Sequence, residues 1–414
     1  MSTEGKIAYI AVTKNGKQLA LRLKKLMGQG DIYITSKLQG EEIEKQENKK
    51  VSNQLVTDIL ANKKQPQDLL EDIKESIRPV YELPKLEQED IKSEHNVSKP
   101  ESEETFVIEG SLGTFMKQLF EDYDYLICIM ATGIVVRSIA PYVVSKFKDP
   151  AVIVMDEKGK HVISLLSGHM GGANEMTRKI STLIKADPVI TTATDTNEKA
   201  ALDCMIKELN AYTENLRESV KAVNYGLVNE EKIGLYIQGD YEVDERGFIR
   251  LDGLDEEALQ RKLSEMERVV YVSHEAGTCI CHDRLIKVVP RRFVLGVGCK
   301  KQISTTHMLE AFEAYMKKHG LDPHSIALIG SIELKKDEEA IKALAQHLEV
   351  PFEVLSKEAI AEVEGLFEGS RFVKQNIGVT CVAEPAAYLL GNREVILPKE
   401  KYEGITFALG VVAK

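Results

Sequence analysis

A glycine-rich stretch at residues 167–174, Ser-Gly-His-Met-Gly-Gly-Ala-Asn, contains the side chains best suited to chemistry in this chain. Its three glycines leave backbone N–H groups unshielded, and the helix expected to follow adds the positive end of its dipole. Such a loop could hold an anion or a developing oxyanion. Ser167 and His169 lie among those donors and could hydrogen-bond to a ligand or carry protons. The other residues predicted to bind a ligand here are Gly168, Gly171, Gly172 and Asn174.

A plainer interpretation of this loop stays open. Glycines often do no more than turn the chain, and His169 could cap a helix or a carbonyl group. Ser167 is less favoured as a covalent nucleophile, because the stretch lacks the glycine that stands two residues before the serine in a nucleophile elbow.

Two further segments place polar residues after apolar runs of strand length. Residues 125–130 (YLICIM) are followed by Thr132, Gly133 and a helical pattern that contains Arg137, while residues 189–196 (VITTATDT) end in hydroxyls and a carboxylate. Ligands gather at strand ends in α/β sheets. The alternative for the second segment is N-capping of a helix near residues 198–209. The predicted binding residues are Thr132, Gly133, Arg137, Thr192 and Thr194, with Asp195 as a catalytic candidate.

The last third of the chain repeats this strand–loop–helix plan. The run FVLGVGC ends in two glycines and is followed by two lysines, which together form an anion-recognition arrangement in an acidic protein. The full dinucleotide-binding fingerprint is absent. Glutamates near helix starts could serve only as caps. The binding residues predicted here are Gly296, Gly298, Lys300, Lys301, Ser331, Lys335 and Glu384.

These loops require parallel sheets to position them. Strand-like runs alternate with helical patterns from residue 6 onward, which predicts an α/β fold. We expect N-terminal and C-terminal parallel-sheet domains at residues 1–210 and 291–414, joined by a smaller middle α/β domain at 211–290. Residues 39–105 are charged and poor in apolar side chains, which indicates a solvated and flexible insertion.

Composition excludes several classes of function. The net charge of −11 argues against a nucleic-acid partner, and no apolar run approaches the length of a membrane span. Six scattered cysteines and a start without signal-peptide features favour a cytoplasmic protein with reduced thiols. Cys279, Cys281 and His282 lack a second ligand cluster, so no protein-bound metal is expected.

Six segments carry a resemblance to a known family. They are ATGIVVRSIAPYV, KDPAVIVMDEKGKHVISLLSGHMGGAN, VITTATDT, VLGVGCKK, SIELKKDEEA and GVTCVAEPAA, and they run from residue 131 to residue 387 in the family's order. The chain resembles the CbiG family, the cobalt-precorrin-5A hydrolases of anaerobic cobalamin biosynthesis. The spread of the segments makes this stronger than a single motif match.

The resemblance implies a particular reaction. Its substrate is a ring-contracted cobalt tetrapyrrole with a δ-lactone. Water opens the lactone, and the extruded carbon leaves as acetaldehyde to give cobalt-precorrin-5B. The cobalt belongs to the substrate, so no cofactor is expected, and neighbouring pathway enzymes are conceivable partners. The alternative from another class is a tetrapyrrole-binding or carrier protein without catalysis.

The reaction assigns a role to each candidate. His169 would be the general base, with Asp195 or Asp149 orienting its imidazole. N–H groups around Gly171 and Gly172 would form the oxyanion hole. The substrate's acetate and propionate groups need cationic partners, for which the candidates are Arg137, Lys300, Lys301 and Lys335, with Arg291 and Arg292 behind them.

Overall fold

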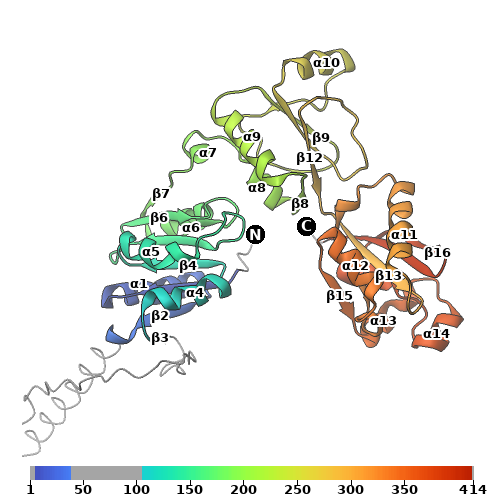
Figure 1. The fold of residues 1–414 in the computed structure, drawn as a ribbon, viewed down its shortest axis with the longest axis horizontal. Helices are drawn as coiled ribbons and strands as arrows, with labels where there is room; N and C mark the ends of the chain where they lie inside the picture. The colour runs from blue at the N-terminus through green and yellow to red at the C-terminus, as the bar shows by residue number, and fades with distance from the viewer. Residues whose placement is uncertain (1–4, 39–104, 413–414) are drawn as a thin grey trace, which may run out of the picture. The chain divides into compact units, whose positions relative to one another are not determined.

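The structure, a computed structural model, describes residues 5–38 and 105–412 (Figure 1). The predicted insertion at residues 39–105 therefore lies almost wholly outside the described residues. The chain divides into two compact units, Met1–Thr191 and Thr192–Lys414. Mostly parallel sheets with helices packed on them confirm the α/β prediction for the N-terminal and C-terminal regions.

The first unit is built on a seven-stranded sheet in the order β3-β2-β1-β4-β5-β6-β7. β1 to β5 run parallel, β6 is antiparallel to β5, and β7 is parallel to β6. The central strands are apolar throughout and buried along their whole length, as expected where both faces are covered. The strands are β1 (Ile7–Ala11), β2 (Asp31–Thr35), β3 (Phe106–Ile108), β4 (Tyr125–Ile129), β5 (Ala151–Met155), β6 (His161–Leu166) and β7 (Asp187–Val189).

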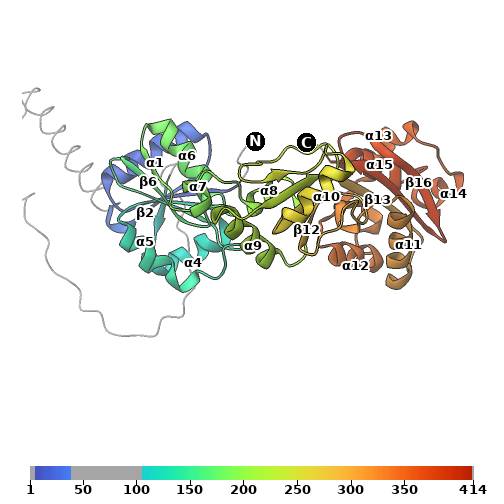
Figure 2. The ribbon, with the colours of Figure 1, turned by 90° about the horizontal axis from the view of Figure 1, so that it is seen from above.

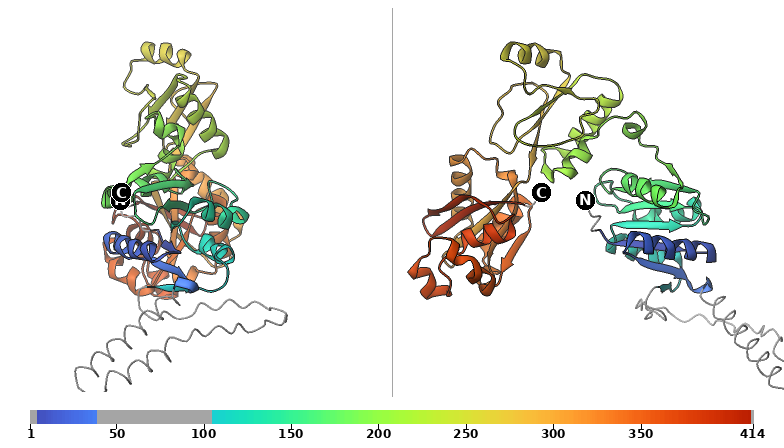
Figure 3. Two further views of the ribbon diagram at one scale, coloured as in Figure 1. Left: turned by 90° about the vertical axis from the view of Figure 1, so that its left-hand side faces the viewer. Right: turned by 180° about the vertical axis from the view of Figure 1, so that it is seen from behind.

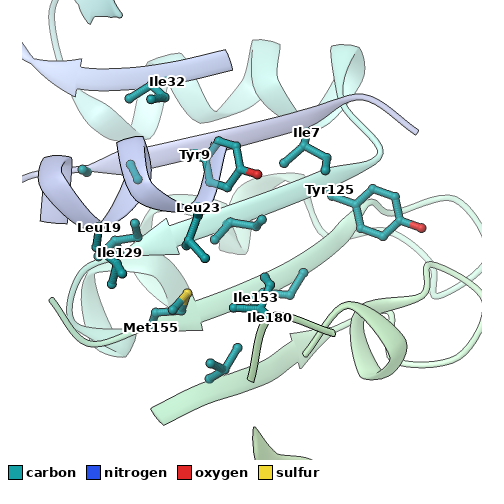
Figure 4. Packing of buried hydrophobic residues seen from close by; sticks show 14 of the residues in the cluster. Ile7, Tyr9, Leu19, Leu23, Ile32, Tyr125, Ile129, Ile153, Met155 and Ile180 are labelled. Carbon is teal, nitrogen blue, oxygen red and sulfur yellow. The ribbon is translucent and has the colours of Figure 1, made fainter. Parts of the chain in front are cut away.

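Helices cover both faces of this sheet. α1 (Lys14–Met27) and α6 (Ala173–Ile184) pack on one face, and α4 (Leu112–Asp122) and α5 (Thr132–Ile139) pack on the other (Figure 2). The short 3-10 helix η1 (Ala140–Tyr142) follows α5. Figure 4 shows side chains of α1 and α6 meeting strand residues in the first of these two cores. Helix packing on both faces therefore holds the strands in place and so positions the loops at the strand ends.

The second unit begins with a five-stranded sheet in the order β10-β9-β11-β12-β8, in which only β8 is antiparallel to its neighbour. α8 and α9 pack on one face and α10 on the other. The elements are α7 (Ala193–Thr196), α8 (Leu202–Glu208), β8 (Ala211–Tyr212), α9 (Leu216–Val228), β9 (Ile233–Ile237), β10 (Ile249–Arg250), α10 (Glu256–Glu265), β11 (Arg268–Val272) and β12 (Leu285–Pro290).

β12 leads directly into the C-terminal sheet (Figure 3). The strand order of this sheet is β15-β14-β13-β17-β16. β13, β14 and β15 are parallel, and β17 and β16 are antiparallel additions. The strands are β13 (Phe293–Cys299), β14 (Ile326–Ile332), β15 (Phe352–Leu355), β16 (Val395–Tyr402) and β17 (Ile405–Val411). The helices are α11 (Thr305–Lys318), η2 (Pro323–Ser325), η3 (Glu333–Lys335), α12 (Glu339–Leu348), α13 (Lys357–Val363), η4 (Glu364–Leu366), α14 (Arg371–Ile377) and α15 (Ala383–Leu390).

Three strand glycines let α15 lie directly on this sheet. A Cβ at Gly296 would overlap the carbonyl oxygen of Ala383, and Gly330 and Gly410 face α15 in the same way. The predicted role of Gly296 in substrate binding is therefore wrong, because the helix backbone already fills the space beside it. The glycine serves close packing.

Polar contacts join the two sheets of the second unit. Lys287 Nζ lies 2.8 Å from Asp322 Oδ2, and Asp322 Oδ1 lies 3.2 Å from His324 Nδ1. The imidazole of His324 stacks on Tyr212 with 3.6 Å between ring centroids. The Asp322 N–H donates to the carbonyl of His274. These contacts add a second connection between the sheets beside the chain itself.

Replacement of Gly296 by alanine should destabilise the second unit. The new methyl group would meet the α15 backbone, and overpacking of this kind costs about 1–3 kcal/mol. Denaturant unfolding followed by circular dichroism measures the loss. Gly365→Ala is the matched control, because a Cβ there has no neighbour within 4 Å. Equal stability of the Gly296→Ala variant and the wild type would contradict the packing described.

Asp322 should make folding stability sensitive to acid. Burial opposes its ionisation, but hydrogen bonds from His324 and Lys287 outweigh that effect and lower the pKa from 3.8 to about 2. Because the folded pKa lies below the unfolded value, the contribution is complete above about pH 4 and is lost as the pH falls through about 2. Asp322→Asn should flatten the dependence of stability on pH in this window. A dependence as steep in Asp322→Asn as in the wild type would contradict this role of Asp322.

Candidate active site

The loop after β6 and the loop after β4 lie at opposite edges of the first sheet. Because β6 runs antiparallel to β5, Leu166 at the end of β6 pairs with Val152 near the start of β5. Thr132 and Gly133, in contrast, follow the carboxyl end of β4. A strand of five residues is about 16 Å long. One small group of a ligand therefore cannot contact both loops, and they form two candidate sites.

The amide groups at the start of α6 are already used inside the glycine loop, residues 167–172. The Gly172 N–H donates to the carbonyl of His169 at 3.0 Å, and the Ala173 N–H donates to that of Ser167 at 3.2 Å. The prediction that Gly172 supplies an oxyanion donor is therefore wrong. Its φ of 85° explains why glycine occupies this position.

Asn174 and Gly168 support the loop. The Asn174 side chain is buried and accepts a hydrogen bond from Ser164 Oγ at 2.6 Å. The Asn174 N–H donates to the carbonyl of Gly168, and a Cβ at Gly168 would lie only 2.7 Å from Asn174 Oδ1. Both residues hold β6, the loop and α6 together, and their roles in substrate binding stay predictions.

Ser167 is strained and buried. Its φ of 55° lies in the left-handed region, and it is only 7% exposed. Gly171 packs against it so closely that a Cβ there would lie 2.8 Å from the Ser167 carbonyl oxygen. Among the described residues, Ser167 Oγ has no hydrogen-bond partner. Backbone strain and an unsatisfied buried hydroxyl each cost about 1–3 kcal/mol, and strain of this kind clusters at functional sites.

His169 lies inside the same loop and is half-buried, with its carbonyl fixed by Gly172. Asp149 does not fit the predicted role of orienting its imidazole. The Asp149 carboxylate is buried and accepts hydrogen bonds from the Val144 and Ser145 N–H groups at 3.0–3.1 Å. It therefore shapes the segment before β5.

The residues predicted from VITTATDT begin the second unit. Thr192 precedes α7, Thr194 is buried within it, and Asp195 lies in its first turn. They do not cap the next helix, because α8 begins after Ala201. The capping alternative is therefore wrong. The catalytic role of Asp195 and the binding roles of Thr192 and Thr194 stay predictions.

The carboxyl edge of the first sheet contains a topological switch point. β1 and β4 are neighbours, and the strands that follow them lie on opposite sides, which is where open α/β sheets bind ligands. Thr13 Oγ1 and Asn15 Nδ2 donate to the Glu157 carboxylate at 2.7 and 3.3 Å. These bonds lower the pKa of Glu157. The Arg137 guanidinium lies 3.5 Å from the Cβ position of Gly133.

Sequence reasoning missed Thr13, Asn15 and Glu157. The signal was present, because TKNG follows the first strand as ATG follows YLICIM. Glu157 already occupies the start of α1. Arg137 at this edge is exposed, and its role in binding a substrate carboxylate stays a prediction.

Ser331 takes no part in an accessible site. It is fully buried, and its Oγ donates to the Val297 carbonyl at 2.7 Å, which ties β14 to β13. Its predicted binding role is wrong for that reason. Lys300 and Lys301 are exposed after β13, and the Cβ position of Gly298 lies 3.7 Å from Val382 Cβ at the start of α15.

Lys335 and Glu384 are both buried in ion pairs. Lys335 Nζ lies 3.0 Å from Glu338 Oε2, and Glu384 Oε2 lies 3.0 Å from Lys399 Nζ. The sequence places Glu338 near Lys335 but does not show that the two side chains pair, and it does not single out Lys399. Neither partner could be found without the fold.

The segment around Cys279 is occupied by internal contacts. Tyr271 OH donates to Cys279 Sγ at 3.4 Å. His282 Nδ1 accepts from the Arg284 N–H at 3.1 Å, and Nε2 lies 3.1 Å from the Met266 carbonyl. Both ring nitrogens of His282 are therefore in use.

Mostly parallel sheets with polar side chains at their strand ends are typical of α/β proteins that bind ligands at those ends. Two family models match: Cobalamin synthesis G N-terminal at residues 114–195 and Cobalamin synthesis G C-terminus at residues 293–410. The chain belongs to this cobalamin synthesis G (CbiG) family, which confirms the resemblance noted from the sequence.

Two cobalt-precorrin-5A hydrolases support the assignment. The cobalt-precorrin-5A hydrolase of Salmonella typhimurium is 41% identical over 315 residues, which cover 75% of this chain and 88% of that protein. The cobalt-precorrin-5A hydrolase of Priestia megaterium is 30% identical over 425 residues, which cover 100% and 96%. A crystal structure of a cobalamin biosynthesis protein G homolog from Sulfolobus solfataricus is 23% identical, covers 72% and 85%, and has a TM-score of 0.33.

No helix among the described residues is both long and apolar enough to cross a membrane.

Glycine substitutions at Ser167 and Lys185 should separate the cost of backbone strain at Ser167 from the cost of its buried hydroxyl. Ser167→Gly removes both the strain and the unpartnered hydroxyl, so it should raise the free energy of unfolding by about 1–2 kcal/mol in denaturant titrations. Lys185→Gly is the control, because Lys185 has a similar φ of 60° at the end of α6. Lys185→Gly should raise the free energy of unfolding only by the amount that relief of backbone strain provides. A loss of stability in Ser167→Gly would show that the hydroxyl makes a stabilising bond.

Proposed function

We propose that this chain hydrolyses cobalt-precorrin-5A, opening its δ-lactone and releasing the extruded carbon as acetaldehyde to give cobalt-precorrin-5B. The observation that carries the proposal is the 41% identity to the Salmonella relative of that name, across 88% of its length. The strained Ser167 beside His169 supplies a site of the required kind. The cobalt is carried by the substrate, and no protein-bound cofactor is invoked.

The reaction balances as the addition of one water. Water attacks the lactone carbonyl, and the acyl–oxygen bond breaks to leave a carboxylate and an alcohol on the extruded carbon. The alcohol then loses its proton, and the bond from its carbon to the macrocycle breaks. The electron pair of that bond stays on the macrocycle, which takes up a proton. The alcohol carbon leaves as the aldehyde, so the substrate provides its own electron sink.

The glycine loop can assist both steps. His169 acts as base for the attacking water and then for the alcohol. The Ser167 hydroxyl and the Gly171 N–H act as donors to the oxyanion, in place of Gly172, whose N–H is occupied. A donor role is proposed for Ser167 in place of nucleophilic attack, because the glycine that stands two residues before the serine in a nucleophile elbow is absent.

Acetaldehyde release from cobalt-precorrin-5A is the direct test. The wild type should release one equivalent. His169→Ala should lower kcat about 10²- to 10⁴-fold, and Ser167→Ala about 10²-fold, because a base or an oxyanion donor is lost. His161→Ala, at an exposed histidine that begins β6, the strand before the glycine loop, should leave turnover unchanged.

Two other outcomes would each reject a specific part of the proposal. Normal turnover by His169→Ala would reject the base assignment but keep the reaction. A change in visible absorbance on substrate binding, without acetaldehyde from the wild type, would favour the carrier function.

A further inference from the structure

Two lysine–glutamate pairs in the C-terminal region are withdrawn from water. In the pair of Lys335 with Glu338, the side chains are 10% and 11% exposed. In the pair of Lys399 with Glu384, they are 20% and 9% exposed. Charged side chains are almost never buried to this extent unless they are paired or functional.

The two pairs lie at one edge of the C-terminal sheet. Gly298 at the end of β13 approaches Val382 at the start of α15, and Val382 packs with Ile332 at the end of β14. Lys335 lies in η3, directly after β14, and Glu384 lies in the first turn of α15. The ends of two parallel strands and the start of a helix therefore converge here. We call Lys335, Glu338, Glu384 and Lys399 the carboxyl-edge cluster.

Stability alone does not account for the cluster. Removing two charges from water costs several kcal/mol per ion, and well-packed apolar residues often stabilise a protein as much or more. The Lys399 N–H also reaches Glu384 Oε1 at 3.3 Å, which ties β16 to α15. That tie uses the backbone of Lys399 and does not require its ammonium group.

The surroundings favour an anionic ligand. Lys300 and Lys301 are exposed just after β13, at the same edge. Burial raises the pKa of the Cys299 thiol to about 11 against a smaller opposing effect of Lys335, so the thiol adds no negative charge at neutral pH. A protein with a net charge of −11 otherwise repels a polycarboxylate.

We propose that the carboxyl-edge cluster binds acetate and propionate carboxylates of the tetrapyrrole, an inference that rests on the proposed function. Glu338 and Glu384 hold the two ammonium groups in place in the free protein. The substrate's carboxylates compete with these glutamates for Lys335 and Lys399. The cluster thus sets affinity for the substrate, while bond breaking occurs elsewhere.

The test is a comparison of KM and kcat for cobalt-precorrin-5A among lysine variants. Lys335→Met and Lys399→Met should each raise KM about tenfold or more, because each removes a charge-assisted hydrogen bond, and should change kcat by less than about threefold. Glu384→Gln should lower KM, because it removes the carboxylate that competes with the substrate for Lys399, whose ammonium group keeps its hydrogen bond to the Glu368 carbonyl. A purely structural pair would not give this last result.

Lys287→Met is the matched control. Lys287 belongs to another ion pair of the second unit with similar exposure, 20% for its side chain and 16% for that of Asp322. This variant should lose stability but keep KM within about twofold. Unchanged KM in both cluster variants would overturn the inference, and so would an equal rise in Lys287→Met.

The proposed function can fail separately. If the wild type releases no acetaldehyde, the reaction is rejected, and the same variants are then compared by the dissociation constant of the substrate from absorbance titration. A tenfold weakening confined to Lys335→Met and Lys399→Met would keep the cluster as a binding site. No binding by the wild type, or equal binding by all variants, would remove it.

Discussion

The antiparallel pairing of β6 with β5 determines where the candidate residues of the first unit lie. Had β6 been parallel, the glycine loop would have joined Thr132 and Gly133 at the carboxyl edge of the sheet. The reversal instead places Ser167 and His169 at the amino ends of β4 and β5. Strand direction is fixed by the short connection from residue 156 to 161, because a parallel crossover needs a dozen residues or more.

Much of the fold follows from local sequence. Apolar runs such as YLICI and AVIVM are buried strands, and the capping pattern at Thr13 begins α1. The glycine loop and the N-terminal strand ends could also be found from residue types and spacing. The edge at which the loop lies was equally predictable, because the turn at Gly159 is too short for a crossover. That signal was not used.

Glycines were the least predictable residues. A glycine after a strand indicates a ligand loop, yet Gly296 lies where it does because α15, which begins 87 residues later, rests on it. Ser331 and Asn174 are similar, because each is a polar residue near the end of a strand or the start of a helix. Each makes a hydrogen bond to a group of another element that only the folded chain places beside it. Contacts between distant segments cannot be deduced from the spacing within one segment.

The remaining candidate residues are distinguished by an energetic cost in the folded state that no contact offsets. Gly172, Asn174, Asp149 and Ser331 all have hydrogen-bond partners that account for these residue types within this fold. Ser167 does not, because its strain and its buried hydroxyl are uncompensated among the described residues. The carboxyl-edge cluster differs again, since its charges are paired but at a desolvation cost that apolar side chains would avoid. Where folding gains nothing from an arrangement, binding or chemistry is the remaining reason to keep it.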